Sequence, residues 1–357
     1  MAGTEVAVIG TGWCGGIRAE SLAKSALVDA LHICEIKPDR LEEVRALTNP
    51  ATATLDYQDI VTNPNISVVY ISTTPEQTHY PIARDCLTAG KNVLLEKPIA
   101  LEFWEADELI ALSEQNQVKF TIGYSQRFNP KIAYAKKTIA EGKLGKVVNV
   151  MVSRHLSRNL GKKIANRVKL SPAAMESTHD LDFVFWLLDH TKPAKIYSQG
   201  AYGYMKDLNG SYDCMWSTVT MEDGTLVVLG GGWNLPPSYP NYCATWIEIT
   251  GTEGALILDD TARDHWMNTV SDGTQYPMST MPGEHVGHVF AGQMGPETIH
   301  FLEDCLLDRP VMVEPTHARM VMETYSAADL SAETGEVIAL PLSNHAIAQL
   351  ADMKAAE

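Results

Sequence analysis

The stretch EVAVIGTGWCG at residues 5–15 joins an apolar run, typical of a buried strand, to a G-x-G-x-x-G turn. In a dinucleotide-binding fold Gly10 permits the tight turn, Gly12 lets the backbone approach a pyrophosphate, and Gly15 allows the next helix to pack closely. The N-terminus of that helix presents free N–H groups and the positive end of its dipole to phosphates. The sequence therefore predicts a dinucleotide site that includes Gly10, Gly12, Trp13, Cys14 and Gly15.

An acidic residue follows this turn at the spacing that the fold uses. A second apolar run, Leu31–Cys34, ends in Glu35, which lies 20 residues after Gly15. A carboxylate here would accept a hydrogen bond from the 2′-hydroxyl of the adenine ribose and repel a 2′-phosphate, which favours NAD over NADP. Lys37, two residues later, could accept that phosphate instead, so NADP stays an alternative cofactor.

The composition is that of a globular chain long enough for two domains. The chain has 357 residues, of which 45% are hydrophobic, and both values fit domains that have their own cores. It carries 28 basic and 44 acidic residues, which gives a net charge of −16. This excess of negative charge argues against nucleic acid and anionic membranes as partners.

Cysteine usage and the start of the chain indicate a cytoplasmic protein. The six cysteines show no C-x-x-C spacing, so we expect reduced thiols. The first apolar run begins at Glu5, which leaves no room for a signal peptide. No apolar run approaches the roughly 20 residues that a membrane helix needs.

The order of the expected elements changes along the chain. Strand and helix patterns alternate over residues 1–123, which predicts an α/β Rossmann domain with a doubly wound parallel sheet. Residues 124–342 are richer in strands, with helices at Met175–Leu188 and Pro315–Thr334, which predicts an α+β domain on a mostly antiparallel sheet for substrate binding and oligomerisation. Residues 343–357 are expected to form a C-terminal tail. The strands of the second domain are expected at residues 147–153, 195–203, 214–220, 225–232, 245–250 and 255–258.

The tripeptide Glu96-Lys97-Pro98 follows an expected strand, Asn92–Leu95. Doubly wound folds bind their ligands at the carboxyl ends of parallel strands. An isolated lysine is usually a surface residue, but Lys97 lies at this edge beside a dinucleotide site and is placed to act on a substrate. Pro98 fixes the turn and permits a cis peptide bond.

The helix expected at Met175–Leu188 has two faces that are both unsuited to open solvent. One is an apolar stripe with the i, i+3, i+4, i+7 spacing of a helix that packs on a sheet, formed by Leu181, Val184, Phe185 and Leu188. The opposite face combines Glu176, His179, Phe183 and Trp186, with Asp182 to one side. That mixture indicates a pocket or an interface, and a structural histidine is the alternative. Glu176 lies three residues before His179, close enough to orient the imidazole.

These motifs together resemble a known family, the glucose–fructose oxidoreductase, inositol dehydrogenase and MocA proteins. The resemblance rests on the glycine turn, on Glu96-Lys97-Pro98, and on His179-x-x-Asp182 followed by Trp186-Leu187-Leu188. It extends over nearly the whole chain and implies a nicotinamide-dependent dehydrogenase that interconverts a secondary alcohol and a ketone on a sugar, inositol or related ring. It also implies cofactor contacts from Glu35, Lys37, Thr73, Thr74, Pro75, His79, Glu96, Lys97 and Arg127.

The resemblance assigns catalytic roles to Lys97 and His179. His179 would remove the hydroxyl proton as the hydride leaves, because a histidine can accept a proton near neutral pH. Lys97 would stabilise the developing alkoxide by a hydrogen bond. Many members have an aspartate four residues before the histidine, where this chain has Met175. Glu176 is expected to take the part of that aspartate, as a third catalytic residue.

A basic segment connects the expected strand at 147–153 to the helix with His179. Residues 154–169 contain no acid, although the chain as a whole is acidic. We expect this segment to pass over the open side of the pocket, where a guanidinium would bind an anionic group of a small-molecule substrate. A solvated loop, or a cover for the cofactor pyrophosphate, is the alternative. Substrate contacts are therefore expected from Lys97, Arg154, Arg158, His179 and Asp182.

The glycine-rich stretch GEHVGH at residues 283–288 has residue types that bind metals. The stretch lies in a glycine-rich loop, and the sequence shows no further partner that would complete a metal site with it. We therefore expect no metal and interpret the stretch as a mobile loop.

Two other functions stay open. The chain would be an NADPH-dependent reductase of a ketone or diol if Lys37 outweighs Glu35, or a non-catalytic dinucleotide-sensing protein. The presence of both Lys97 and His179 argues against the second. An antiparallel sheet covered by helices on one side needs cover on the other, so we expect a homodimer or homotetramer.

Overall fold

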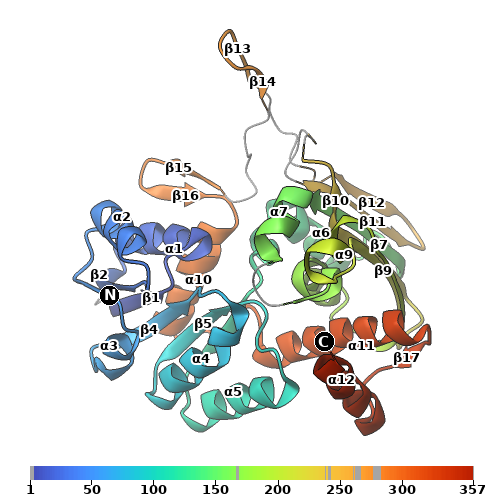
Figure 1. The fold of residues 1–357 in the computed structure, drawn as a ribbon, viewed down its shortest axis with the longest axis horizontal. Helices are drawn as coiled ribbons and strands as arrows, with labels where there is room; N and C mark the ends of the chain where they lie inside the picture. Colours follow the sequence, from blue (N-terminus) through green and yellow to red (C-terminus); the bar gives the residue numbers. More distant parts are fainter. Residues whose placement is uncertain are drawn as a thin grey trace. The chain divides into compact units, whose positions relative to one another are not determined.

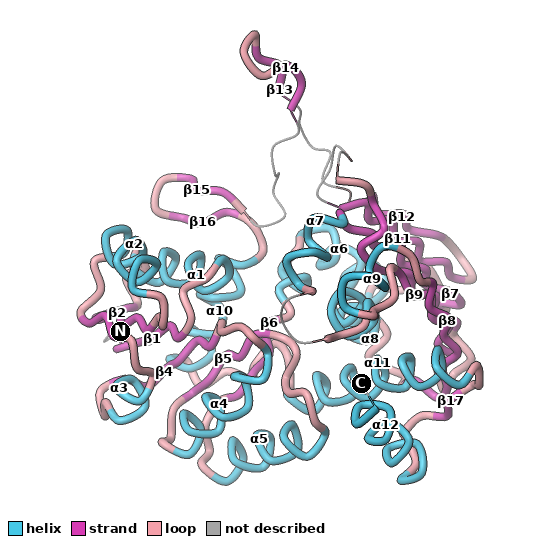
Figure 2. The backbone as a smooth tube through the Cα atoms, viewed as in Figure 1, coloured by secondary structure: helices cyan, strands magenta, loops and turns pink. Residues whose placement is uncertain are grey.

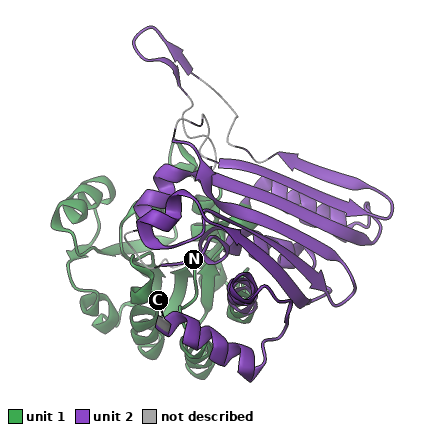
Figure 3. Cartoon of the chain, turned by 45° about the vertical axis from the view of Figure 1, so that its right-hand side comes forward, with its two compact units in different colours: residues 1–128, 282–319 green, residues 129–281, 320–357 purple. Residues whose placement is uncertain are grey.

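The computed structural model describes residues 4–165, 169–237, 239, 243–259, 261, 267–275 and 283–356. The chain divides into two compact units, shown in green and purple in Figure 3, and each unit contains two separate stretches of sequence. Unit 1 comprises residues 1–128 and 282–319, and unit 2 comprises residues 129–281 and 320–357.

Unit 1 contains the parallel sheet that the sequence predicts. Its six strands lie in the order β3-β2-β1-β4-β5-β6, and every neighbouring pair is parallel. Figure 1 labels β2, β1, β4 and β5 of this sheet. The order reverses between β1 and β4, which creates the crevice where such sheets bind nucleotides. The strands are β1 (Thr4–Ile9), β2 (Val28–Cys34), β3 (Thr52–Thr54), β4 (Ile66–Ile71), β5 (Asn92–Glu96) and β6 (Phe120–Gly123).

Helices alternate with these strands along the chain (Figure 2). Pro38 occupies the first turn of α2, where its missing N–H would have no partner in the helix. Glu102 and Glu105 form a capping box at the start of α5, in which their side chains accept backbone N–H groups that are free at the helix end. The buried core joins β1, β2 and β4 to apolar residues of α1, α2 and α10. The helices are α1 (Trp13–Ala23), α2 (Pro38–Thr48), α3 (Gln58–Thr62), α4 (His79–Thr88), α5 (Phe103–Gln115) and α10 (Met294–Leu306), with short 3₁₀ turns at Glu76–Thr78 and Ser125–Phe128.

The domain boundary predicted at residue 123 lies close to residue 128, where the first stretch of unit 1 ends. The prediction did not include the second stretch, which returns to unit 1 later in the chain. Residues 282–319 belong to unit 1, because α10 packs against α1 and contributes Phe301 and Leu302 to the core of the Rossmann domain. Neither side chain has a sequence pattern that links it to a sheet so far away in the chain.

The glycine-rich stretch expected as a loop contains a β-hairpin, β15 (Glu284–Val286) with β16 (Val289–Ala291). Its His285 lies between two residues of α1: Nε2 is 2.8 Å from Glu20 Oε2, and Nδ1 is 3.1 Å from Lys24 Nζ. Because a lysine ammonium only donates, Nδ1 accepts and Nε2 donates to the carboxylate. The hairpin is therefore fastened to the outside of α1.

Unit 2 contains a mostly antiparallel sheet of seven strands in the order β12-β11-β7-β10-β9-β8-β17, and β7 and β10 form its parallel pair. The strands are β7 (Val147–Ser157), β8 (Pro193–Ala201), β9 (Cys214–Met221), β10 (Leu226–Leu235), β11 (Cys243–Gly251), β12 (Ala255–Asp259) and β17 (Ile338–Ala339). A separate hairpin joins β13 (Met267–Thr269) to β14 (Gly273–Gln275). The helices are α6 (Pro130–Ala140), α7 (Arg158–Ile164), α8 (Thr178–Leu187), α9 (Tyr204–Asn209), α11 (Pro315–Thr334) and α12 (Asn344–Ala356).

Two predictions for this region are wrong. The expected tail forms α12, in which Ala346 and Leu350 are buried. These two residues are four apart and lie on one helical face, a signal too short to recognise in the sequence. The basic segment was expected to pass over the open side of the pocket, but its described first part continues β7 to Ser157 with alternating burial, and α7 follows at once.

Across the described residues, no helix combines the length and the apolar character needed to cross a membrane. The six cysteines are all free thiols.

Candidate active site

The glycine turn after β1 has the geometry that each glycine requires. Gly10 has a φ of +83°, a left-handed conformation that other residues rarely adopt. A Cβ on Gly15 would lie 1.8 Å from the carbonyl oxygen of Gly10, so only glycine fits there. A Cβ on Gly12 would meet no described atom within 4 Å. The backbone at Gly12 is therefore open to a ligand of the size of a pyrophosphate.

A cavity of about 580 Å³ opens beside this turn, within the range usual for cofactor sites. It is lined from the ends of β1, β2 and β4, the strands on either side of the point where the strand order reverses. Residues expected from the sequence that line it are Gly10, Gly12, Trp13, Glu35, Lys37, Thr73 and Thr74. Residues that the sequence analysis missed include Ile36, Arg40, Tyr57, Ser72 and Thr78.

The carboxylate of Glu35 is fixed by three hydrogen bonds. Oε2 accepts the backbone N–H of Thr11 at 2.9 Å and its hydroxyl at 3.3 Å, and Oε1 accepts the backbone N–H of Lys37 at 3.1 Å. A carboxylate has about four acceptor positions. The remaining one, on Oε1, is available for a single ribose hydroxyl.

Arg40, which was not predicted, stabilises the backbone of the glycine turn beside Glu35. Its Nε donates to the carbonyl of Thr11 at 2.7 Å, its Nη2 donates to the carbonyl of Gly12 at 3.2 Å, and its Nη1 lies 2.7 Å from Glu43. The guanidinium thus holds the glycine turn from outside. The available signal was its position three residues after Lys37, on the same side of the helix that follows Glu35.

His79, expected at the cofactor site, is buried. Its Nδ1 lies 2.9 Å from the carbonyl oxygen of Pro98, and its Nε2 lies 3.1 Å from that of Thr73. The ring therefore bridges the loops after β4 and β5. The second of these loops begins with Lys97, which is half-buried and joined to Pro98 by a cis peptide bond. Thr74 and Pro75 are also joined by a cis bond.

Glu96 takes part in a buried ion-pair network that no sequence motif predicts. Arg18 of α1 donates from Nη2 to Glu96 Oε1 at 2.6 Å and to Glu297 Oε2 at 2.7 Å, and from Nη1 to Thr298 at 3.0 Å. Burial alone would lower the pKa of Arg18, but Glu297 and Glu96 outweigh it and raise the pKa. The network connects the glycine-turn helix, the strand before Lys97 and α10.

Cys14 lies at the start of α1, beside this network. Burial, reinforced by the charge of Glu96, raises the pKa of its thiol to about 12. The thiol therefore stays protonated, and Cys14 can contribute to a phosphate site through its backbone N–H.

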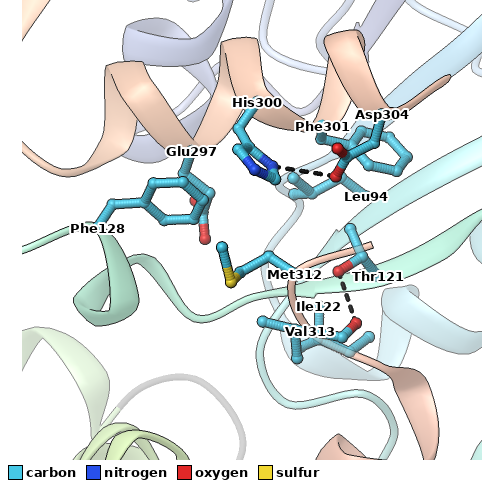
Figure 4. A pocket seen from close by; sticks show the side chains of 10 residues that line it. All are labelled: Leu94, Thr121, Ile122, Phe128, Glu297, His300, Phe301, Asp304, Met312 and Val313. Carbon is cyan, nitrogen blue, oxygen red and sulfur yellow. Dashed lines mark hydrogen bonds and ion pairs between the residues drawn. The ribbon is translucent and has the colours of Figure 1, made fainter. Parts of the chain in front are cut away.

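A second cavity in unit 1 is far smaller, about 10 Å³, roughly the space of one water molecule. Figure 4 shows His300 and Asp304 of α10 beside it, with Nδ1 and Oδ2 3.0 Å apart. Burial raises the pKa of Asp304, although His300 opposes the shift. Met312, at the other side of this cavity, accepts a hydrogen bond on its carbonyl from Arg127 Nη1 at 2.7 Å. Arg127, expected at the cofactor site, is thus buried in contact with this backbone.

In unit 2 the helix with His179 begins irregularly. Ala173–Ser177 forms a π-helical turn, and α8 follows from Thr178. The predicted apolar stripe is buried, as expected, and Phe183 and Asp182 on the other side are buried as well. His179 itself is half-buried. Glu176 is buried as well and Trp186 is half-buried. That this face looks into a pocket or an interface stays a prediction.

The comparison with known proteins agrees with this architecture. A model of the "Oxidoreductase family, NAD-binding Rossmann fold" matches residues 4–124, and a model of the "GFO/IDH/MocA C-terminal domain" matches residues 132–257. The chain belongs to the GFO/IDH/MocA oxidoreductase family. Unit 1 is its NAD-binding Rossmann domain.

Relatives in this family include inositol dehydrogenases. An inositol 2-dehydrogenase/D-chiro-inositol 3-dehydrogenase of Lactiplantibacillus plantarum is 29% identical over 52% of this chain and 53% of its own length, so this match spans about half of either protein. A myo-inositol 2-dehydrogenase of Thermotoga maritima is 23% identical over 71% and 75%. The crystal structure of scyllo-inositol dehydrogenase from Lactobacillus casei with bound NAD(H) and scyllo-inositol has a TM-score of 0.80 at 21% identity, covering 94% of this chain and 99% of the other. That likeness concerns the fold.

The family's acidic position before the histidine is filled differently here. Met175 belongs to a buried apolar cluster. The carboxylate of Glu176 accepts a hydrogen bond on Oε1 from Nε1 of Trp233, at 2.7 Å. The expectation that this carboxylate points toward the imidazole assumed regular α-helical rotation, which the π-helical turn interrupts.

The basic segment also differs from expectation. Arg154 is buried on β7, and its Nε donates to Asp180 Oδ1 at 2.8 Å. This ion pair already balances its charge, so Arg154 is no free guanidinium over a pocket. Arg158 begins α7 with its guanidinium 5.8 Å from the ring of Tyr204. Arg167 lies outside the described residues.

Proposed function

We propose that this family member is an NAD-dependent dehydrogenase that oxidises a secondary alcohol on a sugar, inositol or related ring. The observation that carries the proposal is the cavity at the glycine turn, with the Glu35 carboxylate held at its edge and Lys97 following the adjacent strand β5. The open space over Gly12 fits a pyrophosphate, and the free acceptor position on Glu35 fits a ribose hydroxyl.

The residues of unit 1 would hold the cofactor in a defined way. The glycine turn and the start of α1 bind the pyrophosphate through backbone N–H groups. Glu35 accepts the adenine-ribose hydroxyl, while Lys37 and Arg40 flank the same corner. Bound NAD supplies the hydride acceptor.

The side chains of the protein must remove the proton of the substrate hydroxyl. In this proposal, which follows the family resemblance, a ring nitrogen of His179 accepts the hydroxyl proton, and Lys97 Nζ stabilises the developing alkoxide by a hydrogen bond. A preorganised donor of this kind typically contributes about 10²- to 10³-fold to kcat. His79 keeps the Lys97 turn in place through the carbonyl of Pro98.

Inositols are the first substrates to test, because relatives of this chain carry that activity in their names. Among the described arginines of the basic segment, Arg154 is paired with Asp180, so we choose Arg158 to test for an anionic substrate. If an anionic ring is the substrate, Arg158→Ala raises its KM and higher salt does the same. Equal KM values for a neutral ring and its carboxylated analogue would contradict an anion site.

The proposal includes assembly through the outer face of the unit 2 sheet. Helices cover its inner face, as shown by the bonds of Arg154 to α8 and of Ser198 to Ser331 of α11. The strand register places Trp216, Gly230, Ser153 and Trp246 in one row on the outer face. Both tryptophans are exposed, and a second copy of this chain would cover them. Light scattering that returns the monomer mass, 39.2 kDa, at micromolar concentration would contradict assembly.

One experiment separates the three candidate functions. The purified chain is incubated with NAD or NADP and a panel of inositols, aldoses and sugar acids, and reduced cofactor is measured. The proposal predicts turnover of at least one ring alcohol with NAD. Turnover with NADP alone would support the reductase, and tight NAD binding without turnover of any compound would support a dinucleotide sensor.

A further inference from the structure

Two parallel strands of unit 2 hold the start of the helix that carries His179. Gly231 of β10 lies opposite Arg154 of β7 in the register, and Trp233 lies two residues further along β10. All three meet the segment around His179, at Glu176, Ser177 and Asp180.

Each contact is close and specific. Trp233 Nε1 donates to Glu176 Oε1 at 2.7 Å, and Arg154 Nε donates to Asp180 Oδ1 at 2.8 Å. Between them, a Cβ added to Gly231 would lie 2.6 Å from the hydroxyl of Ser177, so a larger residue there would force that hydroxyl to rotate away. The contacts lie three residues before His179, two before it and one after it.

Burial makes these contacts restrictive. Trp233 is 0% exposed, Glu176 is 7% exposed and Asp180 is 1% exposed. In such surroundings a lost hydrogen-bond partner is not replaced by bulk water. The side chains are therefore held in one arrangement.

The backbone before His179 needs such support. Ala173–Ser177 is a π-helical turn, a form that is rare and concentrated at functional sites. Its wider turn rotates Glu176 toward Trp233 and the apolar cluster that contains Met175. The sheet thus fixes the residue at which the regular helix starts. It also fixes the orientation of the side chain of His179, the second residue of that helix.

We propose that Trp233 and Glu176 are positioning residues for His179. Trp233 fixes the carboxylate, the carboxylate fixes the π-helical turn, and the turn sets the orientation of the imidazole. Glu176 exchanges no proton with His179 in this account. The inference rests on the proposed role of His179 as the base.

Two substitutions distinguish positioning from a proton relay. Glu176→Gln keeps an oxygen that accepts the Trp233 N–H but removes the charge, so positioning survives and a relay does not. Trp233→Phe keeps an aromatic ring and removes the donor, so positioning is lost. Trp246→Phe is the matched control, because Trp246 also donates to a carboxylate, Glu248 at 3.2 Å, and the phenyl ring keeps an aromatic side chain on the face proposed for assembly. The mass of this variant in light scattering must equal that of the wild type.

The first measurement is kcat, KM and the pH profile of kcat. We expect Glu176→Gln to stay within about twofold of the wild type with the same pH profile. Trp233→Phe should lower kcat by roughly tenfold or more with unchanged NAD affinity, since small misplacements of a reacting group are costly, and Trp246→Phe should change neither. A large loss and a displaced pH profile in Glu176→Gln, or equal kcat for the two tryptophan variants, would overturn the proposal.

The second measurement does not depend on turnover. The imidazole signals of ¹³C-labelled histidine are recorded by NMR, and that of His179 is assigned with His179→Gln. Trp233→Phe should displace or broaden the His179 signal, whereas Glu176→Gln and Trp246→Phe should leave it in place. If the wild type oxidises no compound, the proposed function fails while this spectrum still decides the positioning. If Trp233→Phe does not fold, Glu176→Ala replaces it: it should displace the signal that Glu176→Gln retains, and an unmoved signal would overturn the proposal.

Discussion

The Glu35 carboxylate and the Thr11 backbone N–H lie 2.9 Å apart and join the end of β2 to the glycine turn after β1. The acid that we propose to select the ribose is thereby joined to the turn that we propose to bind the pyrophosphate. Its remaining acceptor position accommodates one hydroxyl, and its charge repels a 2′-phosphate.

Replacing Glu35 should therefore weaken NAD binding and relax the cofactor preference. We expect the wild type to prefer NAD on the order of a hundredfold, and Glu35→Gln to reduce that preference about tenfold or more, because the amide lacks the charge that repels a 2′-phosphate. Its NH2 group must also face a backbone N–H that donates to Glu35, which weakens the site for both cofactors. Calorimetric titration of both cofactors measures the ratio. Equal or tighter binding of NADP by the wild type would refute the assignment.

Lys97 and His179 are expected to act mainly on the reaction, although the resemblance also implies a cofactor contact from Lys97. Lys97→Ala and His179→Ala should each lower kcat by roughly 10² or more, since each removes a group that acts in the transition state. The Kd for NAD should stay nearly unchanged, because neither residue belongs to the glycine turn. Steady-state kinetics with the best ring alcohol provides the test, and near-normal turnover of either variant would remove that residue from the mechanism.

The Arg18 network should contribute strongly to the stability of unit 1. Arg18→Met leaves Glu96 and Glu297 without the guanidinium that joins them, and breaking a buried ion pair costs about 3–5 kcal/mol. Arg45→Met is the control, because the Arg45–Glu42 pair is largely exposed and such pairs contribute about 0–1 kcal/mol. Urea unfolding of both variants gives the comparison. Similar losses would show that burial does not strengthen the Arg18 network.

How far the sequence predicts this site depends on the range of the signal. The glycine turn and Glu35 are recognisable because one βαβ unit places them together within a short stretch of chain. Lys97 follows from the rule that ligands bind at strand ends. Arg18 is different: its partner Glu297 lies 279 residues away, and no local pattern couples two such charges.

The helix with His179 shows a second limit. The regular rotation of an α-helix correctly predicts the buried apolar stripe of Leu181, Val184, Phe185 and Leu188. It fails for Glu176, because one π-helical turn changes the direction of a single side chain. The prediction that Arg154 contacts a substrate fails for a related reason. The alternating burial of β7 continues beyond the expected strand end at Ser153 and buries the arginine.

His155 makes stability depend on pH. In the folded state, burial lowers the pKa of the His155 imidazole below its usual value of 6.5. The unfolded chain therefore binds the proton more readily. The stabilisation from the neutral imidazole is therefore complete above about pH 6.5 and is lost as the pH falls through the lowered folded-state pKa. His155→Gln should flatten this part of the stability profile, and His345→Gln, an exposed control on α12, should not. Identical slopes of urea midpoint against pH for wild type and His155→Gln would contradict the expectation.

The central claim is that a ring carbon of the substrate gives its hydride to NAD. The most direct test supplies the best ring alcohol with deuterium on the carbinol carbon and analyses the cofactor by mass spectrometry after a single turnover. We predict that the reduced cofactor carries one deuterium and that it forms more slowly than with the undeuterated alcohol. A reduced cofactor without deuterium, or no reduced cofactor at all across the panel, would contradict the account.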